Sequence, residues 1–472
     1  MSIKILIISV YALVTLIIGW LGMKKAKTFD DYFLGGRAIG PWMTAFTYAA
    51  AYFSAVLFIG FAGKIGWGFG LSGLWIALGN ASIGVLGVWG LLGNRIRKMS
   101  IDYRVSTMPE FLEKRYQSPF FKLLSSAAIF VFLVPYSAAV FIGLAYLFKA
   151  NFGVSYTLAL AFMGVFTAFY LVLGGYKSMT MIDVFFGMIM CAGSLILIAS
   201  TLHKGGGLAN IAAGLARLDP KLTAPVGPGG FWPLVCLVFL TSVAPFAMPQ
   251  LVQKFYAIRD EKAIRTGMIA STLFSALIAA AAYFTGATAR LFLTPESAPN
   301  AFSGGKPIFD ILMPEFLANV IPPSLSIIMM LLILAASMST LAALVLISSS
   351  SVAKDLYAGF VNPGVSDKRL TMLMRILGAA FVLLSVVLAY FKPASIVSIL
   401  SVSWGAVGSF FLGPFVWGII SRKVTRFGAL ASAILGLGTC LGLSIAGMSA
   451  PAAGTIGMIV SFAGNPLFSL IK

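Results

Sequence analysis

The chain has 472 residues, of which 60% are hydrophobic and only 10% are charged. Soluble proteins carry about 25% charged residues, so this composition excludes a soluble enzyme or binding domain. The net charge of +19 does not indicate nucleic acid, because the basic residues lie in short loops between apolar segments. We therefore expect one all-α polytopic membrane domain over residues 1–472, with the lipid bilayer as its surroundings and no evident obligate protein partner.

Apolar segments long enough to cross a bilayer recur along the whole chain. A spanning helix needs about 20 such residues. The first segment is too long for a signal peptide and lacks a small-residue cleavage site, so we expect it to remain as a span. We predict about thirteen transmembrane helices, at residues 3–22, 41–65, 71–92, 121–148, 155–173, 180–202, 230–251, 266–290, 324–351, 370–391, 395–420, 427–447 and 452–471.

The basic residues are distributed unequally between the two sides of the predicted bundle. With span ends counted in the nearer loop, 23 of the 33 Lys and Arg residues fall on the side of loop 23–40 and 8 on the other. The larger set includes Lys254, which follows the span 230–251. The positive side of a membrane protein faces the cytoplasm. We therefore predict a cell-membrane protein with its N-terminus outside and its C-terminus in the cytoplasm.

Two groups of five spans can be compared, residues 41–202 and residues 230–420. Because five is odd, the two groups have opposite orientations, the pattern of inverted-repeat transporters. The first helix of the second group contains Pro245 and Pro249, which predict a kink or gap there. The first group begins with small residues and has no such marker. Residues 1–40 are then an extra N-terminal helix and loop, and residues 421–472 are two C-terminal helices.

Asp183 is the one carboxylate that falls inside an apolar span, in the string "TMIDVFFGMIM". A carboxylate at that depth costs about 2.5–3.5 kcal/mol on insertion scales, and by default such a residue has a function. The other interpretation is an Asp near a helix start that reaches cytoplasmic water. The sequence leaves both interpretations open.

The string "AASMSTLAA" places Ala336, Ser339 and Thr340 on one face of a span, at positions i, i+3 and i+4. Two hydroxyls and a carbonyl oxygen on one face suit a small alkali cation. The same pattern also serves as a seam between helices, because Ser and Thr are common there. Ser337 lies on the other side, where we expect it only to pack.

Four separated strings, "TFDDYFLGGRAIGPW", "LGGYKSMTMIDVFF", "MSTLAALVLISSSSVAKDLY" and "ISRKVTRFGALASAILGLG", together resemble the sodium/solute symporter family, nearest its proline and pantothenate branch. The resemblance implies a LeuT-type fold of five plus five helices and solute uptake coupled to Na⁺. It also implies a Na⁺ site made by the backbone oxygens of Ala50 and Phe53, the Ala336 carbonyl and the Ser339 and Thr340 hydroxyls.

The family resemblance bears on stoichiometry and solute as well. Ala342 and Ala343 stand where several members carry hydroxyls for a second Na⁺, so we expect one Na⁺ per solute, although Asp183 matches the coupling carboxylate of that second site. We expect the solute to be a small amino acid such as proline, or a monocarboxylate or pantothenate-like acid. The residues that we expect to line its cavity are Tyr52, Ser54, Tyr136, Thr241, Ser242 and Trp404.

Three other functions were compared with Na⁺-coupled symport. A membrane enzyme needs a nucleophile and a base, and the single His203 at a span end has no acidic partner nearby in the sequence. A transporter-like sensor would be expected to carry an appended signalling domain, whereas this chain ends one residue after its last predicted span. A proton-coupled transporter of the same fold, with Asp183 as the proton carrier, remains an open alternative.

Overall fold

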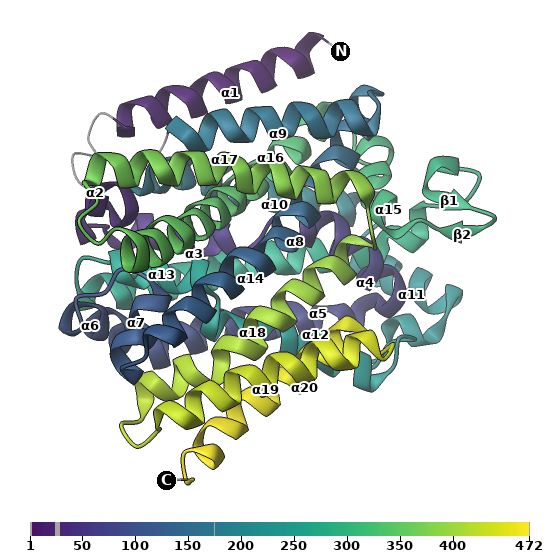
Figure 1. The fold of residues 1–472 in the computed structure, drawn as a ribbon. Helices are drawn as coiled ribbons and strands as arrows, with labels where there is room; N and C mark the ends of the chain where they lie inside the picture. The colour runs from purple at the N-terminus through teal and green to yellow at the C-terminus, as the bar shows by residue number, and fades with distance from the viewer. Residues whose placement is uncertain (1, 24–28, 174, 472) are drawn as a thin grey trace.

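The computed structural model describes residues 2–23, 29–173 and 175–471, and helices that run side by side make up nearly all of it (Figure 1). One antiparallel hairpin, β1 (Phe302–Ser303) with β2 (Lys306–Pro307), is the only sheet among these residues. Residues 24–28 of the predicted loop 23–40 lie outside the described residues. The all-α architecture expected from the composition is confirmed.

The helices of the first half include several π-helical and 3₁₀ segments between the regular ones. They are α1 (Ser2–Met23), α2 (Phe29–Leu34), a 3₁₀ turn (Gly35–Arg37), α3 (Pro41–Tyr52), a π segment (Val56–Phe61), α4 (Ala62–Phe69), a 3₁₀ turn (Gly70–Gly73), α5 (Leu74–Gly79), two π segments (Asn80–Gly87 and Trp89–Gly93), α6 (Asn94–Asp102), α7 (Met108–Tyr116), α8 (Pro119–Phe152), α9 (Tyr156–Leu173), α10 (Tyr176–Lys204) and α11 (Leu208–Leu218).

The second half also contains 3₁₀ and π-helical segments between regular helices. It comprises a 3₁₀ turn (Pro220–Thr223), α12 (Phe231–Val243), a 3₁₀ turn (Ala244–Ala247), α13 (Pro249–Ala257), α14 (Glu261–Phe292), a 3₁₀ turn (Pro299–Ala301), α15 (Phe309–Glu315), a π segment (Phe316–Val320), α16 (Pro323–Ser350), a π segment (Ser351–Val361), α17 (Asp367–Phe391), α18 (Ile396–Ile420), α19 (Arg426–Ile445) and α20 (Ala450–Phe468).

The number of spans differs from the sequence-based prediction. In the described part of the chain, 9 helices are long and apolar enough to cross a membrane, or up to 10 when a bent pair is counted as one span. The predicted thirteen are not confirmed. One reason is that Val56–Asp102 runs as a single helical stretch across the second and third predicted spans. Another is that α9 carries only a short apolar stretch, Tyr156–Phe169.

The first broken helix lies between α3 and α4. The Phe53 N–H closes α3 on the Ala49 carbonyl at 3.3 Å. Phe53 itself is extended, with φ −112° and ψ 136°. The chain resumes a helical path at Ala55, whose φ and ψ are −50° and −29°. Backbone carbonyls before this gap therefore have no helical partner, which a membrane helix tolerates only where other protein groups face it.

The second broken helix lies between α12 and α13, where the sequence predicts it. The two halves are bent by 42°. Met248 between them is extended, with φ −76° and ψ 116°. Proline fixes φ and lacks an N–H, so Pro245 and Pro249 interrupt the helical hydrogen bonds on either side of Met248. The half-helix α13 continues the path of the chain and is buried along its whole length.

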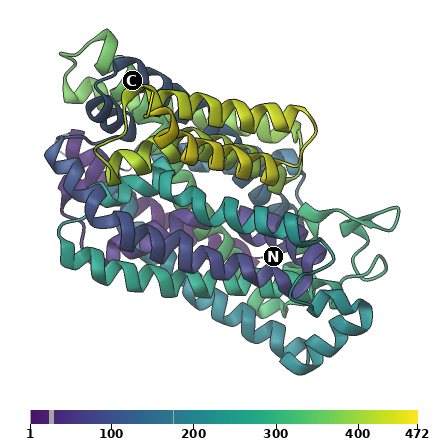
Figure 2. The ribbon, with the colours of Figure 1, turned by 90° about the horizontal axis from the view of Figure 1, so that it is seen from below.

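α16 and α18 form the centre of the bundle, with 94% and 89% of their most apolar windows buried. α1 lies on the outside against α9 and α10, and only 17% of its window is buried. Seen from below, α19 and α20 lie side by side over one flank (Figure 2). The chain ends marked N and C in Figure 1 lie at opposite ends of the bundle, the hairpin being at the N end. Both broken helices face α16.

Candidate functional site

The hydroxyl of Thr340 on α16 lies among four backbone carbonyl oxygens at the gap between α3 and α4. Its Oγ1 is 3.3 Å from Ala50 O, 3.4 Å from Ala51 O and 3.1 Å from Phe53 O. The Ala336 carbonyl, one turn earlier on α16, lies 3.1 Å away. One hydroxyl proton serves only one of these acceptors at a time. The cluster is rich in oxygen and short of donors, and these residues fit a desolvated alkali cation.

Ser339 and Ser337 lie in the same turn of α16 and have different surroundings. Ser339 Oγ is buried and makes no hydrogen bond of good geometry with any described residue, although its hydroxyl interacts with the Asp183 carboxylate. Ser337 Oγ accepts from the Ala55 N–H at 2.9 Å and donates to the Ile333 carbonyl at 2.6 Å. The expectation that Ser337 only packs is wrong, because its hydroxyl binds the backbone directly after the gap.

Asp183 on α10 is fully buried and accepts a hydrogen bond from Thr47 on α3. Its second oxygen, Oδ1, has no hydrogen-bond partner within the described ranges. Lys254 on α13 is also fully buried, and its Nζ lies 3.4 Å from Thr47 Oγ1. The expectation that Lys254 belongs to an inner loop is wrong. The helix restarts at Pro249 after the gap and carries Lys254 into the core.

A small cavity lies next to the oxygen cluster, between the two broken helices, α8 and α18. Its free volume is about 30 Å³, room for no more than a few water molecules. A solute therefore enters only when the enclosing helices separate. The lining contains aromatic, aliphatic and neutral polar side chains and no charged one: Tyr52, Phe53, Ser54, Val56, Leu57, Phe61, Asn80, Tyr136, Thr241, Tyr283, Leu400 and Trp404.

Aromatic rings form the walls of this cavity. The rings of Tyr52 and Trp404 are stacked, with centroids 5.8 Å apart and planes 12° apart. Tyr136 meets Trp404 edge-on, with centroids also 5.8 Å apart. The Tyr52 hydroxyl donates to the Thr241 carbonyl at 2.5 Å and so joins the two broken helices. The Trp404 indole N–H is buried and makes no hydrogen bond of good geometry to the described chain, although it interacts with the Tyr136 hydroxyl.

The structure brings most of the predicted solute residues together, but not all of them. Ser242 is absent from the lining, and its hydroxyl lies 3.3 Å from Asn80 Oδ1, to which it donates. Asn80 and Tyr283 line the cavity and were not predicted. Both lie in long apolar segments, and no motif in the sequence marks them.

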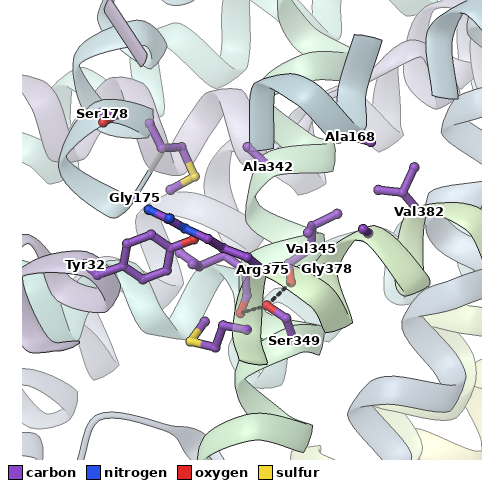
Figure 3. Close-up of a pocket in the computed structure, with 14 residues that line it drawn as sticks. Tyr32, Ala168, Gly175, Ser178, Ala342, Val345, Ser349, Arg375, Gly378 and Val382 are labelled. Carbon is purple, nitrogen blue, oxygen red and sulfur yellow. Dashed lines mark hydrogen bonds between the residues drawn. The ribbon is translucent and has the colours of Figure 1, made fainter. Parts of the chain in front are cut away.

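A separate pocket lies between α2, α10, α16 and α17 and has a free volume of about 40 Å³. Figure 3 shows Arg375 lying against Tyr32 at its edge. The guanidinium carbon is 5.8 Å from the centre of the Tyr32 ring. Ser349, on the α16 side, donates to the carbonyls of its own helix. A fixed positive charge does not suit a cation, so this pocket is distinct from the oxygen cluster at Thr340.

Comparison with known proteins identifies relatives across most of the chain. The family model described as "Sodium:solute symporter family" matches residues 32–436. The sodium/pantothenate symporter of Haemophilus influenzae is 27% identical over 437 residues, which cover 90% of this chain and 86% of that protein. The osmoregulated proline transporter OpuE of Bacillus subtilis is 28% identical, covering 93% and 89%.

A solved structure shows the same fold. A Na⁺-coupled sialic acid symporter in a substrate-bound, outward-open state superposes with a TM-score of 0.83 and 17% sequence identity. The match covers 100% of this chain and 98% of that chain. The expected LeuT-type fold of five plus five helices is thereby confirmed, whereas the low identity carries no information on the solute.

Proposed function

Because the chain belongs to the sodium:solute symporter family, we propose that it takes up a compact zwitterionic amino acid, such as proline, together with one Na⁺. The protein is a Na⁺-coupled membrane transporter and not an enzyme. Na⁺ is its coupling ion, and the proton-coupled alternative built on Asp183 is not favoured.

We assign the Na⁺ site to five oxygens: the carbonyls of Ala50, Phe53 and Ala336 and the hydroxyls of Ser339 and Thr340. The Thr340 hydroxyl within 3.4 Å of four carbonyls supports this assignment. The ion would replace its lost hydration shell with these oxygens and would join α16 to the gap in the second span. The Asp183 carboxylate on α10 interacts with the Ser339 hydroxyl.

The solute assignment depends on the lining of the cavity beside this cluster: no charged residue of the described chain lines it, and it contains the buried Trp404 indole N–H, which makes no hydrogen bond of good geometry there. The indole N–H would donate to a carboxylate, and the Tyr52 and Trp404 rings would hold an apolar body. A zwitterion brings both of its charges and needs no lysine or carboxylate in the wall.

The overall arrangement follows from the same proposal. Residues 41–202 and 230–420 would be the two inverted repeats, each beginning with a broken helix. The N-terminus would lie outside and the C-terminus inside. One Na⁺ crossing about 100 mV supplies about 2.3 kcal/mol. A tenfold Na⁺ gradient adds about 1.4 kcal/mol. One ion per solute therefore supports accumulation of a neutral molecule by several hundredfold.

The test is uptake of radiolabelled L-proline into proteoliposomes that contain the purified protein. A Na⁺ gradient with choline inside should drive accumulation, and a pH gradient without Na⁺ should not. Unlabelled L-proline in excess should abolish the signal, and pantothenate should leave most of it. Uptake driven by the pH gradient alone would refute Na⁺ coupling. Competition by pantothenate with none by proline would refute the amino-acid assignment.

A further inference from the structure

Lys254 is a lysine buried in the middle of a membrane protein. It lies on α13, the inner half of the second broken helix, and its side chain is fully buried. Its Nζ donates to Thr47 Oγ1 at 3.4 Å and lies 5.0 Å from the centre of the Tyr176 ring. Neither of these neighbours carries a charge. A buried ammonium is costly unless a carboxylate balances it.

Asp183 is the carboxylate that balances Lys254. Thr47 lies between them, accepting from the ammonium and donating to Asp183 Oδ2. Among the described residues, Lys254 is the one charged side chain with an electrostatic effect on Asp183. Asp183 is likewise the one charged side chain with such an effect on Lys254. The two form an isolated pair with no net charge. Asp183 therefore needs no mobile cation to be neutralised within the bilayer.

The two oxygens of Asp183 face different neighbours. Oδ2 faces Thr47 and, through it, the fixed ammonium. Oδ1 has no hydrogen-bond partner in the described chain, and the carboxylate interacts with Ser339, a ligand of the Na⁺ site proposed above. One carboxylate thus stands between a fixed cation and a mobile one.

We propose that Lys254 is a built-in cation that occupies, at Asp183, the position a second mobile Na⁺ would otherwise take. The ammonium thereby limits the transporter to one Na⁺. Lys254 acts through Thr47 and Asp183 and is a positioning residue, since it does not touch the ion. This inference rests on the proposed Na⁺ site, because it concerns the charge behind Ser339. Through Thr47 on α3 and Lys254 on α13, the inner half-helices of both repeats interact with Asp183.

The test counts bound Na⁺. Equilibrium binding of ²²Na⁺ to purified protein in choline chloride should give about one ion per chain for the unaltered protein and for Lys254→Arg, which keeps the charge. Lys254→Gln leaves Asp183 without a partner, so it should bind about two ions per chain, with the unfolding temperature rising more steeply with Na⁺ concentration. The double variant Asp183→Asn with Lys254→Gln should return to about one ion, because neither charge remains.

The outcomes separate this inference from the proposed function. One ion per chain in Lys254→Gln overturns the role of Lys254. If Lys254→Gln does not fold, the charge-neutral double variant decides: folding with one bound ion supports the pairing, and failure to fold overturns it. Thr340→Val tests the site itself and should bind no ion. If Thr340→Val still binds one, the proposed site is wrong, while the count in Lys254→Gln still decides the question of the built-in cation.

Discussion

The hydroxyl oxygen of Thr340 lies 3.1 Å from the carbonyl oxygen of Phe53, although 287 residues separate the two in the chain. α16 therefore closes directly over the gap in the first broken helix. Any ion held at this point touches a rigid helix and a broken one at the same time. Its arrival and departure change the energy of their relative placement, which is the physical requirement for coupling an ion to a conformational change.

Removal of the Thr340 hydroxyl tests this arrangement most directly. Thr340→Val keeps the shape of the side chain but removes the oxygen. We expect the Na⁺ concentration for half-maximal uptake to rise by tenfold or more, because a hydrogen-bond-type contact to a charged group is worth about 1.5–3 kcal/mol and each 1.4 kcal/mol is about tenfold. Ser339→Ala should act in the same direction. The measurement is Na⁺-dependent L-proline uptake in proteoliposomes.

Ser385→Ala is the matched control for these two variants. Ser385 is also buried in a span, but its hydroxyl donates to the Phe381 carbonyl of its own helix, α17. Its loss should leave the Na⁺ dependence unchanged. Equal Na⁺ dependence in Thr340→Val and in the unaltered protein would show that the ion lies elsewhere.

The fold was readable from the sequence, whereas the contacts around the proposed ion site were not. Long apolar segments predict helices, and Pro245 and Pro249 predict the bend between α12 and α13. No proline or glycine in the sequence marks the gap at Phe53. Hydroxyls from α16 contact the backbone on both sides of this gap. Lys254 was misplaced for the same reason. Lys254 is buried because the chain turns back into the core after the bend at Met248. A prediction from apolar segments alone places the end of each segment at the membrane surface.

Ser337 provides a second test, directed at the support of the gap and not at the ion. In Ser337→Ala the Ala55 N–H loses the hydroxyl that accepts it at 2.9 Å. A buried donor without a partner costs about 1–3 kcal/mol. We expect a lower unfolding temperature both with and without Na⁺, together with weaker Na⁺ binding. Ser349→Ala is the control, since its hydroxyl bonds only to carbonyls of α16. Equal unfolding temperatures in the two variants would contradict the role of Ser337.

Trp404 tests the solute assignment. Trp404→Phe keeps an aromatic wall against Tyr52 but removes the buried indole N–H. We expect the KM for L-proline to rise about tenfold, the equivalent of one lost hydrogen bond to a charged carboxylate, with little change in Na⁺ dependence at saturating solute. Trp417→Phe on the same helix is the control, because its indole N–H already donates to the Phe462 carbonyl at 2.8 Å. An unchanged KM in Trp404→Phe would exclude the indole as a carboxylate donor.

Asp310 on α15, outside the spanning helices, predicts a pH dependence of stability. Burial raises the pKa of Asp310 to about 6, against the opposing effects of the Ile396 N–H and the Lys64 charge. The folded protein therefore binds a proton in a range, between the ordinary 3.8 and about 6, where the unfolded chain does not. By linkage, the contribution of Asp310 to stability grows as the pH falls from about 7 to about 4. The limit is about 3 kcal/mol for a shift of about two units.

The difference in unfolding temperature between the unaltered protein and Asp310→Asn isolates this contribution from the other carboxylates. The unaltered protein should gain on the variant as the buffer changes from pH 7.5 to pH 5, because the amide does not titrate. Asp219→Asn serves as the control, since Asp219 is exposed and accepts, among the described residues, from the Lys221 N–H of its own turn. Its difference from the unaltered protein should not follow the same curve. Parallel curves for Asp310→Asn and the unaltered protein would show that α15 does not hold a partly buried carboxylate against the start of α18.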